Sequence, residues 1–413
     1  MPSPATPSSV PLTPTPLTHV IASLDMAAAG TTVWLTRLVE ELQAQGREVT
    51  TLAVSMDTAT PPDLHGLQTY PSDFAKVPGV SKLLFSDQLH RAIRQRCELG
   101  SLLHVSGLWR MPNVYPGWVA KKTGCELILS PHGMLGPGAL TFSAGQKKLF
   151  AALVQNRALH SVSCFHVTSE KEAADVRAYG LRAPLALIPN GIDLPPIEAL
   201  QSVQALDERA PTVSTTVSTT GPGRSILYLG RVHPKKGIDK LIAAWAELEH
   251  GYPHWQVDIV GPSEIGYADD LQRQAVSAGL QRVHFHQGVY GDAKTQKFVQ
   301  ADIVVLPTLD ENFGLVVGEA LAAGTPVICT HGAPWADLHQ HGCGWWIEHG
   351  VSPLQAALKD AMARPRETLK DMGQRGRGWM ARDFAWPAVA QQMLALYNWI
   401  DGRAEQPPFV QPD

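Results

Sequence analysis

The clearest chemical signal in the sequence is a pair of glutamates, Glu311 and Glu319, within the segment 306–320. A buried strand is predicted to end at Leu306, a polar loop carries Glu311, and a helix is predicted to begin near Gly314. Glycine lets a ligand approach the backbone, and the first turn of a helix has unpaired N–H groups that attract an anion. Glu319 then lies about one and a half turns into the helix. Both carboxylates are expected to face one ligand; the alternative is two solvated surface glutamates.

Two cations stand at the end of an earlier predicted strand. The segment 229–238 places Arg231 and Lys236 between this strand and the next helix, and Gly230 opens the loop. A guanidinium is a planar fork of donors and an ammonium is a compact charge, which together suit a diphosphate. The neighbouring Lys235 is expected to be solvated. The alternative is two exposed cations on an ordinary loop.

With Asn312, Phe313 and Gly314 between them, the two glutamates resemble the paired-glutamate signature of glycosyltransferase family 4. The resemblance implies that Glu311 binds hydroxyl groups of a donor sugar and that Glu319 binds the ribose hydroxyls of the nucleotide. It also implies that the backbone of the intervening segment approaches the sugar and the phosphates, at Asn312, Phe313, Gly314 and Leu315.

The cation loop and two further segments are similar to the same family. The family's diphosphate-binding loop has matching cations, so the resemblance implies that the two cations neutralise the leaving group and that Gly230 lies at the donor. Gly261 falls in a turn like the one near the family's donor, and the chain at Val289 and Tyr290 matches the stretch that passes the nucleotide base.

The first half of the chain matches the family at fewer positions. His132 follows a predicted strand and precedes a glycine, and it matches a family histidine that reaches the transferring sugar from the opposite wall of the cleft. A structural histidine is the alternative. Gly30 corresponds to a glycine-rich turn that lets donor phosphate or acceptor approach. The family shows paired glycines there, whereas Ala29 precedes a single glycine in this chain.

The resemblance implies a retaining transfer from a UDP- or GDP-linked sugar, with Glu311, His132, Arg231 and Lys236 as the catalytic residues. Charge that develops on the departing phosphate is what fixed cations and amides stabilise. No carboxylate stands out as a general base, and a same-face route in which the departing phosphate accepts the proton needs none. No Asp-x-Asp pair stands where a metal-held diphosphate requires it. Neither a metal nor another cofactor is therefore expected.

Strands and helices that alternate along the chain must position these residues. Apolar runs predict strands in the first half at 19–24, 49–54, 102–105, 126–129, 164–167 and 186–188, with a helix over 31–45 after a small-residue turn that ends at Gly30. In the second half they predict strands at 225–229, 256–260, 283–285, 303–306 and 326–329. Such alternation is typical of parallel sheets with right-handed crossovers. The resemblance gives the arrangement its name, GT-B: two Rossmann-like doubly wound domains that face each other across a central cleft.

The domain boundaries follow from shifts in composition. Residues 1–18 are rich in Pro, Ser and Thr and are expected to form a disordered tail. An acceptor domain over 19–200 and a donor-nucleotide domain over 225–383 are joined by a linker at 201–224. A helical segment over 384–413 is expected to cross back to the first domain, as in the family.

The overall composition excludes several classes of protein. The chain has 413 residues, which is too many for one hydrophobic core, and 44% of them are hydrophobic. A formal net charge of −4 offers no footprint for nucleic acid. Five cysteines without close or metal-type spacing are typical of reduced thiols in a cytoplasmic protein. No apolar run reaches about 18 residues, and the amino terminus does not resemble a signal peptide.

The acceptor is left open by the sequence. Many relatives in the family build lipopolysaccharide or exopolysaccharide, so a saccharide or lipid-linked saccharide is expected. Residues 141–160 mix cations with apolar side chains, so a helix there could lie on the inner face of a membrane; a lid or ordinary surface helix is the equally open alternative. An epimerase or phosphorylase of the same fold is the second enzyme hypothesis, and a sugar-binding protein without catalysis is a third.

Overall fold

The computed structural model describes residues 14–24, 29–55, 62–141, 143–198, 200, 223–263 and 266–412. The chain divides into two compact units. Unit 1 comprises Met1–Val167, Ala173–Ile188 and Ala390–Asp413, and unit 2 comprises Thr168–Glu172 and Pro189–Val389. Most of the predicted tail and of the predicted linker lies outside the described residues.

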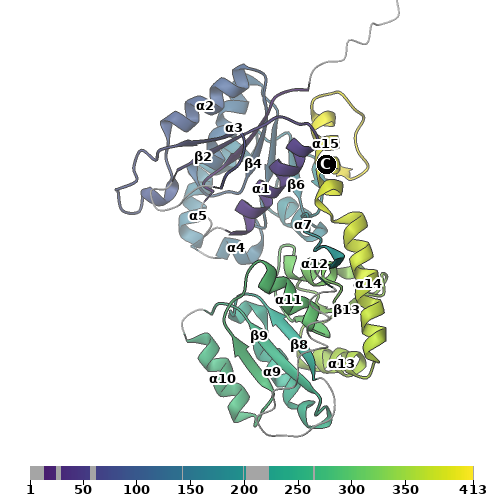
Figure 1. Ribbon diagram of the computed structural model, residues 1–413. Coiled ribbons are helices and arrows are strands. Elements are labelled where there is room, and N and C mark those ends of the chain that lie inside the picture. The colour runs from purple at the N-terminus through teal and green to yellow at the C-terminus, as the bar shows by residue number, and fades with distance from the viewer. Residues whose placement is uncertain are drawn as a thin grey trace, which may run out of the picture. The chain divides into compact units, whose positions relative to one another are not determined.

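Unit 1 is built on an eight-stranded sheet with the order β14-β7-β6-β5-β4-β1-β2-β3 (Figure 1). Its neighbouring strands are parallel, except that β14 runs antiparallel to β7. The strands are β1 (Leu17–Ile21), β2 (Val49–Val54), β3 (Leu67–Tyr70), β4 (Leu102–Ser106), β5 (Leu127–Ser130), β6 (Cys164–Val167), β7 (Leu185–Leu187) and β14 (Val410–Gln411).

Amphipathic helices connect the strands of unit 1. Leu35, Leu38, Val39 and Leu42 recur on one face of α1 and are fully buried, which explains why this segment is helical. The helices are α1 (Ala29–Ala44), α2 (Asp87–Glu98), α3 (Met111–Thr123), α4 (Pro137–Thr141), α5 (Ala144–Phe150), α6 (Asn156–Leu159) and α7 (Glu170–Ala178), with a π-helical turn at Ala151–Gln155. Helix α15 (Trp386–Ile400) returns the chain from unit 2 to unit 1.

Unit 2 is built on a six-stranded parallel sheet with the order β10-β9-β8-β11-β12-β13. The strands are β8 (Arg224–Leu229), β9 (Trp255–Val260), β10 (Val283–His286), β11 (Ile303–Leu306), β12 (Val327–Thr330) and β13 (Gly344–Ile347). The helices are α9 (Ile238–Ala246), α10 (Tyr267–Ser277), α11 (Asp292–Gln300), α12 (Leu315–Ala322), α13 (Val351–Met362) and α14 (Arg366–Asp383), with a short 3-10 turn at Pro234–Lys236. This is a doubly wound order, in which the first strand lies inside the sheet.

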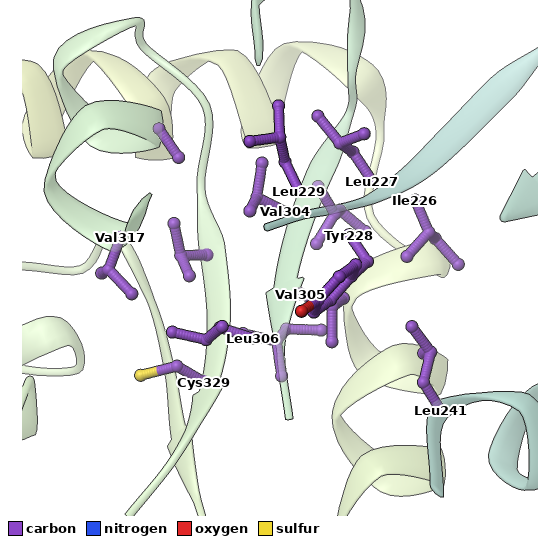
Figure 2. Packing of buried hydrophobic residues seen from close by; sticks show 14 of the residues in the cluster. Ile226, Leu227, Tyr228, Leu229, Leu241, Val304, Val305, Leu306, Val317 and Cys329 are labelled. Atoms are coloured by element: carbon purple, nitrogen blue, oxygen red, sulfur yellow. The ribbon is translucent and has the colours of Figure 1, made fainter. Parts of the chain in front are cut away.

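The core of unit 2 centres on the strands β8 and β11. Their side chains are almost fully removed from solvent, as expected for a parallel sheet covered by helices on both faces. Figure 2 shows Tyr228 among the aliphatic side chains of these strands, with its hydroxyl oxygen drawn in red. This packing holds the carboxyl ends of β8 and β11 in fixed positions.

Two local predictions were wrong. The turn predicted to end at Gly30 does not extend that far, because Gly30 is the second residue of α1. Glycine is tolerated there because the first N–H groups of a helix have no partner within the helix. The helix predicted over 141–160 begins only at Ala144, because Ser143 has a left-handed φ of 55°. From Ala144 the chain stays helical to Leu159, through α5, the π-helical turn and α6.

Candidate functional site

The loops with the predicted donor residues follow two adjacent strands of unit 2. Arg231 and Lys236 follow β8, and Glu311 follows β11. From these two central strands the chain continues in opposite directions along the sheet, to β9 and β10 on one side and to β12 and β13 on the other. Such a switch point opens a crevice at the carboxyl ends of the strands, where doubly wound proteins bind their ligands.

An ion pair joins the two loops. Lys236 Nζ donates to Glu311 Oε1, and each side chain is 19% exposed. Gly237, which follows Lys236, has a φ of 68°, and a Cβ atom there would overlap the carbonyl oxygen of Pro307. The backbone of the first loop therefore packs directly on the end of β11, and only glycine permits this approach.

Tyr228 fixes the backbone of the loop that carries Arg231 and Lys236. Its side chain is fully buried and its hydroxyl group donates to the carbonyl oxygen of Arg231 at 2.8 Å. Burial raises the pKa of Tyr228, the charge of Glu311 raises it further, and the charge of Arg231 lowers it. The phenol therefore stays protonated as a donor, and its electrostatic partners are the cation and the carboxylate predicted for the donor site.

Two glycines let the turns after β8 and β9 touch. Gly230 N donates to the carbonyl oxygen of Val260 at 2.9 Å. A Cβ atom on Gly261 would overlap the carbonyl oxygen of Gly230. Any side chain at Gly261 would thus displace the loop that carries Arg231, which explains the glycine at this position. Gly230 has a φ of 151°, which residues with a side chain rarely adopt.

The loop that carries Glu311 is held by the chain after β12. Glu311 N donates to the carbonyl oxygen of Gly332 at 2.8 Å, and the Thr330 hydroxyl group donates to the carbonyl oxygen of Thr308. The side chain of Phe313 is 6% exposed and packs on Trp335 at a centroid distance of 5.1 Å. Phe313 therefore offers a ligand its backbone and keeps its ring in the core.

The side chain of Asn312 faces the start of α7 within unit 2. Asn312 Nδ2 donates to Thr168 Oγ1 at 3.1 Å and approaches Glu172 Oε2 at 3.5 Å. The hydroxyl group of Ser169 donates to the carbonyl oxygen of Asn312 at 3.1 Å, and Lys171 pairs with Asp310 at 2.7 Å. The loop is thus anchored on a second side, and the Asn312 amide is engaged within the protein.

The helix predicted to begin near Gly314 is α12. Gly314 is its N-cap with a φ of 78°, and Leu315 is its first residue and 37% exposed. The N–H groups of this first turn have no helical partners and carry the positive end of the helix dipole. Unpartnered N–H groups of this kind are suited to bind an anion.

Glu319 lies in the same helix and pairs with a residue that the sequence analysis did not consider. Lys294 Nζ donates to Glu319 Oε1 at 2.5 Å. Lys294 is the third residue of α11, which follows the loop with Val289 and Tyr290. Val289 packs on the unit 2 core, and Tyr290 is 75% exposed.

His132 lies in unit 1, in the turn after β5. Its φ of 51° is left-handed, its ring lies edge-on to Trp34 at 4.7 Å between centroids, and its Nε2 atom is buried without a hydrogen-bond partner among the described residues. Burial, together with the nearby His166, lowers the pKa of His132 to about 3. The side chain is thus a neutral imidazole.

A buried polar network lies beside His132. His104 connects the Tyr397 hydroxyl group, at 2.8 Å, with the Ser130 hydroxyl group, at 2.7 Å. Ser130 in turn contacts His166 at 2.7 Å, and His166 reaches the carbonyl oxygen of Ile188 at 2.9 Å. The network runs across the sheet of unit 1 from helix α15 to the last residue before the chain enters unit 2.

Three residues that contact the predicted site were missed from the sequence: Tyr228, Trp335 and Lys294. Tyr228 and Trp335 act through bonds to backbone carbonyl groups, which leave no mark in a sequence. Lys294 precedes its partner by 25 positions, and only the packing of α11 on α12 brings the two together.

Family comparisons identify the class of protein that this fold and these loops define. Residues 219–379 match the model described as "Glycosyl transferases group 1", and residues 29–191 match the "Glycosyl transferase 4-like domain". The chain therefore belongs to the group 1 glycosyltransferases of family 4, and it is an enzyme of the GT-B fold. The fold class and the family inferred from the sequence are confirmed.

The curated relatives bear names of glycosyltransferases. A D-inositol 3-phosphate glycosyltransferase from Segniliparus rotundus is 27% identical over 72% of this chain, which spans 66% of that protein. A phosphatidyl-myo-inositol mannosyltransferase from Mycobacterium tuberculosis is 26% identical over 89% of this chain and 92% of that protein.

Solved structures share the fold over almost the whole chain. A sucrose-phosphate synthase from Thermosynechococcus elongatus has a TM-score of 0.69 at 22% identity and covers 94% of this chain and all of its own. The Anabaena protein HepE in complex with UDP has a TM-score of 0.69 at 18% identity, with 93% and 100% covered.

Proposed function

We propose that this glycosyltransferase moves a sugar from a UDP- or GDP-linked donor to a saccharide or lipid-linked saccharide, with retention of the anomeric configuration. The observation that carries the proposal is the ion pair of Lys236 with Glu311 at the switch point between β8 and β11, on the same loop that carries Arg231. Two cations beside a helix N-terminus suit a diphosphate, and a carboxylate beside them suits the hydroxyl groups of a sugar.

In the proposed reaction the bond between the anomeric carbon and the phosphate oxygen breaks. The nucleoside diphosphate leaves with the bonding electrons, and the acceptor oxygen attacks from the same face and gives its proton to the departing phosphate. Arg231, Lys236 and the N–H groups at Gly314 stabilise the charge that develops on this phosphate. Glu311 holds the sugar hydroxyl groups, and Glu319 holds the ribose. The role of His132 towards the transferred sugar, as a neutral donor or acceptor, rests on its resemblance to the family histidine and stays a prediction.

We propose that neither a metal nor a cofactor takes part. What supports this is the supply of positive charge from the chain itself, which does the electrostatic work that a divalent ion would otherwise do. Transfer should therefore persist in excess EDTA, and a loss of activity that Mg²⁺ or Mn²⁺ restores would contradict this part of the proposal.

The experiment that tests the function is a screen of UDP- and GDP-hexoses against saccharide acceptors, with the anomeric configuration of the product read by NMR. Glu311→Ala and Arg231→Ala should each reduce transfer by about a hundredfold or more while the fold survives. Lys240→Ala, which removes an exposed cation paired with Asp239, is the matched control. Near-normal transfer in either the Glu311 or the Arg231 variant would contradict the assignment of these residues to the donor site. Release of free or epimerised sugar, without transfer, would favour the epimerase or phosphorylase hypothesis.

We also propose that the acceptor is met at a membrane surface, in the synthesis of lipopolysaccharide or exopolysaccharide on the cytoplasmic side. What supports this is the segment from α5 to α6, in which Leu149 and Leu153 are 63% and 70% exposed one helical turn apart. Lys148 and Arg157 are exposed on the same segment. Exposed leucines flanked by cations suit an anionic lipid surface. Among the described residues, no helix is long and apolar enough to cross a membrane.

A further inference from the structure

The ion pair between Glu319 and Lys294 points to a role for a residue outside the predicted site. Lys294 Nζ contacts Glu319 Oε1 at 2.5 Å, and the two side chains are 28% and 31% exposed. Both are therefore partly shielded from solvent, where an ion pair is screened less than at an open surface.

The position of Lys294 is fixed by its place in helix α11. It lies in the first turn of α11, where its N–H group donates to the carbonyl oxygen of Gly291 at 3.0 Å. Its ammonium group lies 6.0 Å from the ring centroid of Phe298, which is 2% exposed and anchors α11 in the core of unit 2. The cation is thus fixed by a helix that is itself packed.

The negative charge of a bound nucleotide donor would act on the Glu319 carboxylate, and Lys294 can offset this effect. A carboxylate next to a diphosphate is repelled by it, and a free glutamate side chain would turn towards water. An ammonium group on one carboxylate oxygen balances the charge and fixes the direction of the group. A carboxylate has about four acceptor positions, so one ammonium contact leaves positions for a pair of hydroxyl groups.

We propose that Lys294 is a positioning residue for Glu319, which holds this carboxylate towards the ribose hydroxyl groups and so determines the preference for ribonucleotide over deoxyribonucleotide donors. The inference rests on the proposed function, in which Glu319 binds the ribose. Lys294 itself needs no contact with the sugar that is transferred.

The test compares the binding of UDP and GDP with that of their 2′-deoxy analogues by calorimetry, in wild type, Lys294→Met, Lys294→Arg and Glu319→Gln. Lys297→Met is the matched control, because Lys297 lies one turn further along the same helix. Wild type should prefer the ribonucleotide by about tenfold, as expected for the loss of one charge-assisted hydrogen bond. Lys294→Met and Glu319→Gln should both abolish this preference, whereas Lys294→Arg should keep most of it.

The outcomes separate the inference from the function on which it rests. If Lys294→Met weakens both nucleotides equally and keeps the preference, the residue acts on the phosphates or on folding, and the inference is wrong. If Lys294→Met behaves like wild type while Glu319→Gln loses the preference, the inference is wrong and the ribose role of Glu319 survives. If wild type shows no preference for the ribonucleotide, Glu319 does not bind the ribose hydroxyl groups and the inference is wrong as well. Transfer of sugar by the same wild-type sample would still support the proposed function.

Discussion

Trp335 donates its indole N–H to the carbonyl oxygen of Phe313 at 2.7 Å, immediately before the glycine that begins helix α12. This bond fixes the peptide that joins the Glu311 loop to the helix N-terminus. Both rings are buried, so water cannot replace the donor if the indole is removed. The orientation of the backbone at Phe313 therefore depends on Trp335, a side chain from the loop that follows β12.

Replacement of Trp335 by Phe should lower the free energy of unfolding and also weaken the binding of the nucleotide-sugar. The variant leaves the Phe313 carbonyl oxygen without its donor, which costs about 1–3 kcal/mol of unfolding free energy, and it loosens the loop that carries Glu311. We expect a higher KM for the nucleotide-sugar in steady-state kinetics, alongside a modest fall in the midpoint of thermal unfolding.

Trp245→Phe is the control for this prediction. Trp245 is fully buried in unit 2 and also donates its indole N–H, to Glu249 at 3.3 Å, but away from the donor loops. It should lower stability to a similar extent and leave the KM unchanged. If both variants change the KM alike, the Trp335 bond has no special role in positioning the loop.

Replacement of Gly261 by Ala should disrupt the loop that carries Arg231 and Lys236. The new Cβ atom would overlap the carbonyl oxygen of Gly230, and a backbone atom in a packed turn has little room to move. We expect a loss of about 1–3 kcal/mol in unfolding free energy, measured in urea, and a clear loss of nucleotide affinity because Arg231 shifts with the loop. Gly251→Ala, where the added Cβ atom has no neighbour within 4 Å, should change neither quantity. Wild-type affinity in Gly261→Ala would contradict the close contact between the two turns.

The elements that carry the donor site were predictable because their signals are local. Strands β2, β6 and β11 begin and end where the apolar runs predict, and the glycine at the start of α12 marks the helix correctly. A strand that is buried on both faces reads as a continuous apolar run, and the polar loop after it then stands out. Glu311 and Arg231 were singled out as candidates in this way, each from one strand and the loop that follows it.

The elements that were missed depend on long-range packing. Helix α3 contains Pro116 and Gly117 and is buried on nearly every side, so it has no amphipathic period. A Cβ atom on Gly117 would overlap Ala158 of α6, which shows that this glycine serves a close helix–helix contact. Strand β3, at the edge of the sheet, exposes its middle residues and gives no apolar run. Long-range packing also explains why Lys294 was not considered from the sequence, since its partner Glu319 lies in another helix.

The histidine network of unit 1 predicts a loss of stability in mild acid. Burial lowers the pKa of His19 and His132 to about 3 and of His166 to about 4, and it lowers the pKa of His104 well below 6.5. The unfolded chain therefore binds more protons than the folded one once the pH falls below about 6.5. The stability that is present above this pH is lost progressively as the pH falls towards 4, by up to about 1.4 kcal/mol per pH unit for each histidine.

Urea unfolding between pH 7 and pH 5 would measure this slope. His19→Gln removes one of the depressed pKa values and should reduce the slope by up to about 1.4 kcal/mol per pH unit. His254→Gln is the control, because this histidine is exposed on unit 2 and lies outside the network, so the slope should stay as in wild type. A stability that is flat between pH 6.5 and pH 5 would show that the network takes up protons without unfolding.

The proposed membrane contact predicts a response that depends on two leucines. Leu149→Asp and Leu153→Asp should each reduce co-sedimentation with vesicles that contain anionic phospholipid, because each leucine that enters the lipid contributes about 1.5–3 kcal/mol and a carboxylate is repelled by the surface. The exposed positions need no refolding to accept Asp, so melting temperature and activity on a water-soluble acceptor should be retained. Val276→Asp is the matched control, since Val276 is 77% exposed on helix α10 of unit 2. If all three variants bind the vesicles as wild type does, the segment is an ordinary surface helix and the acceptor reaches the enzyme by another route.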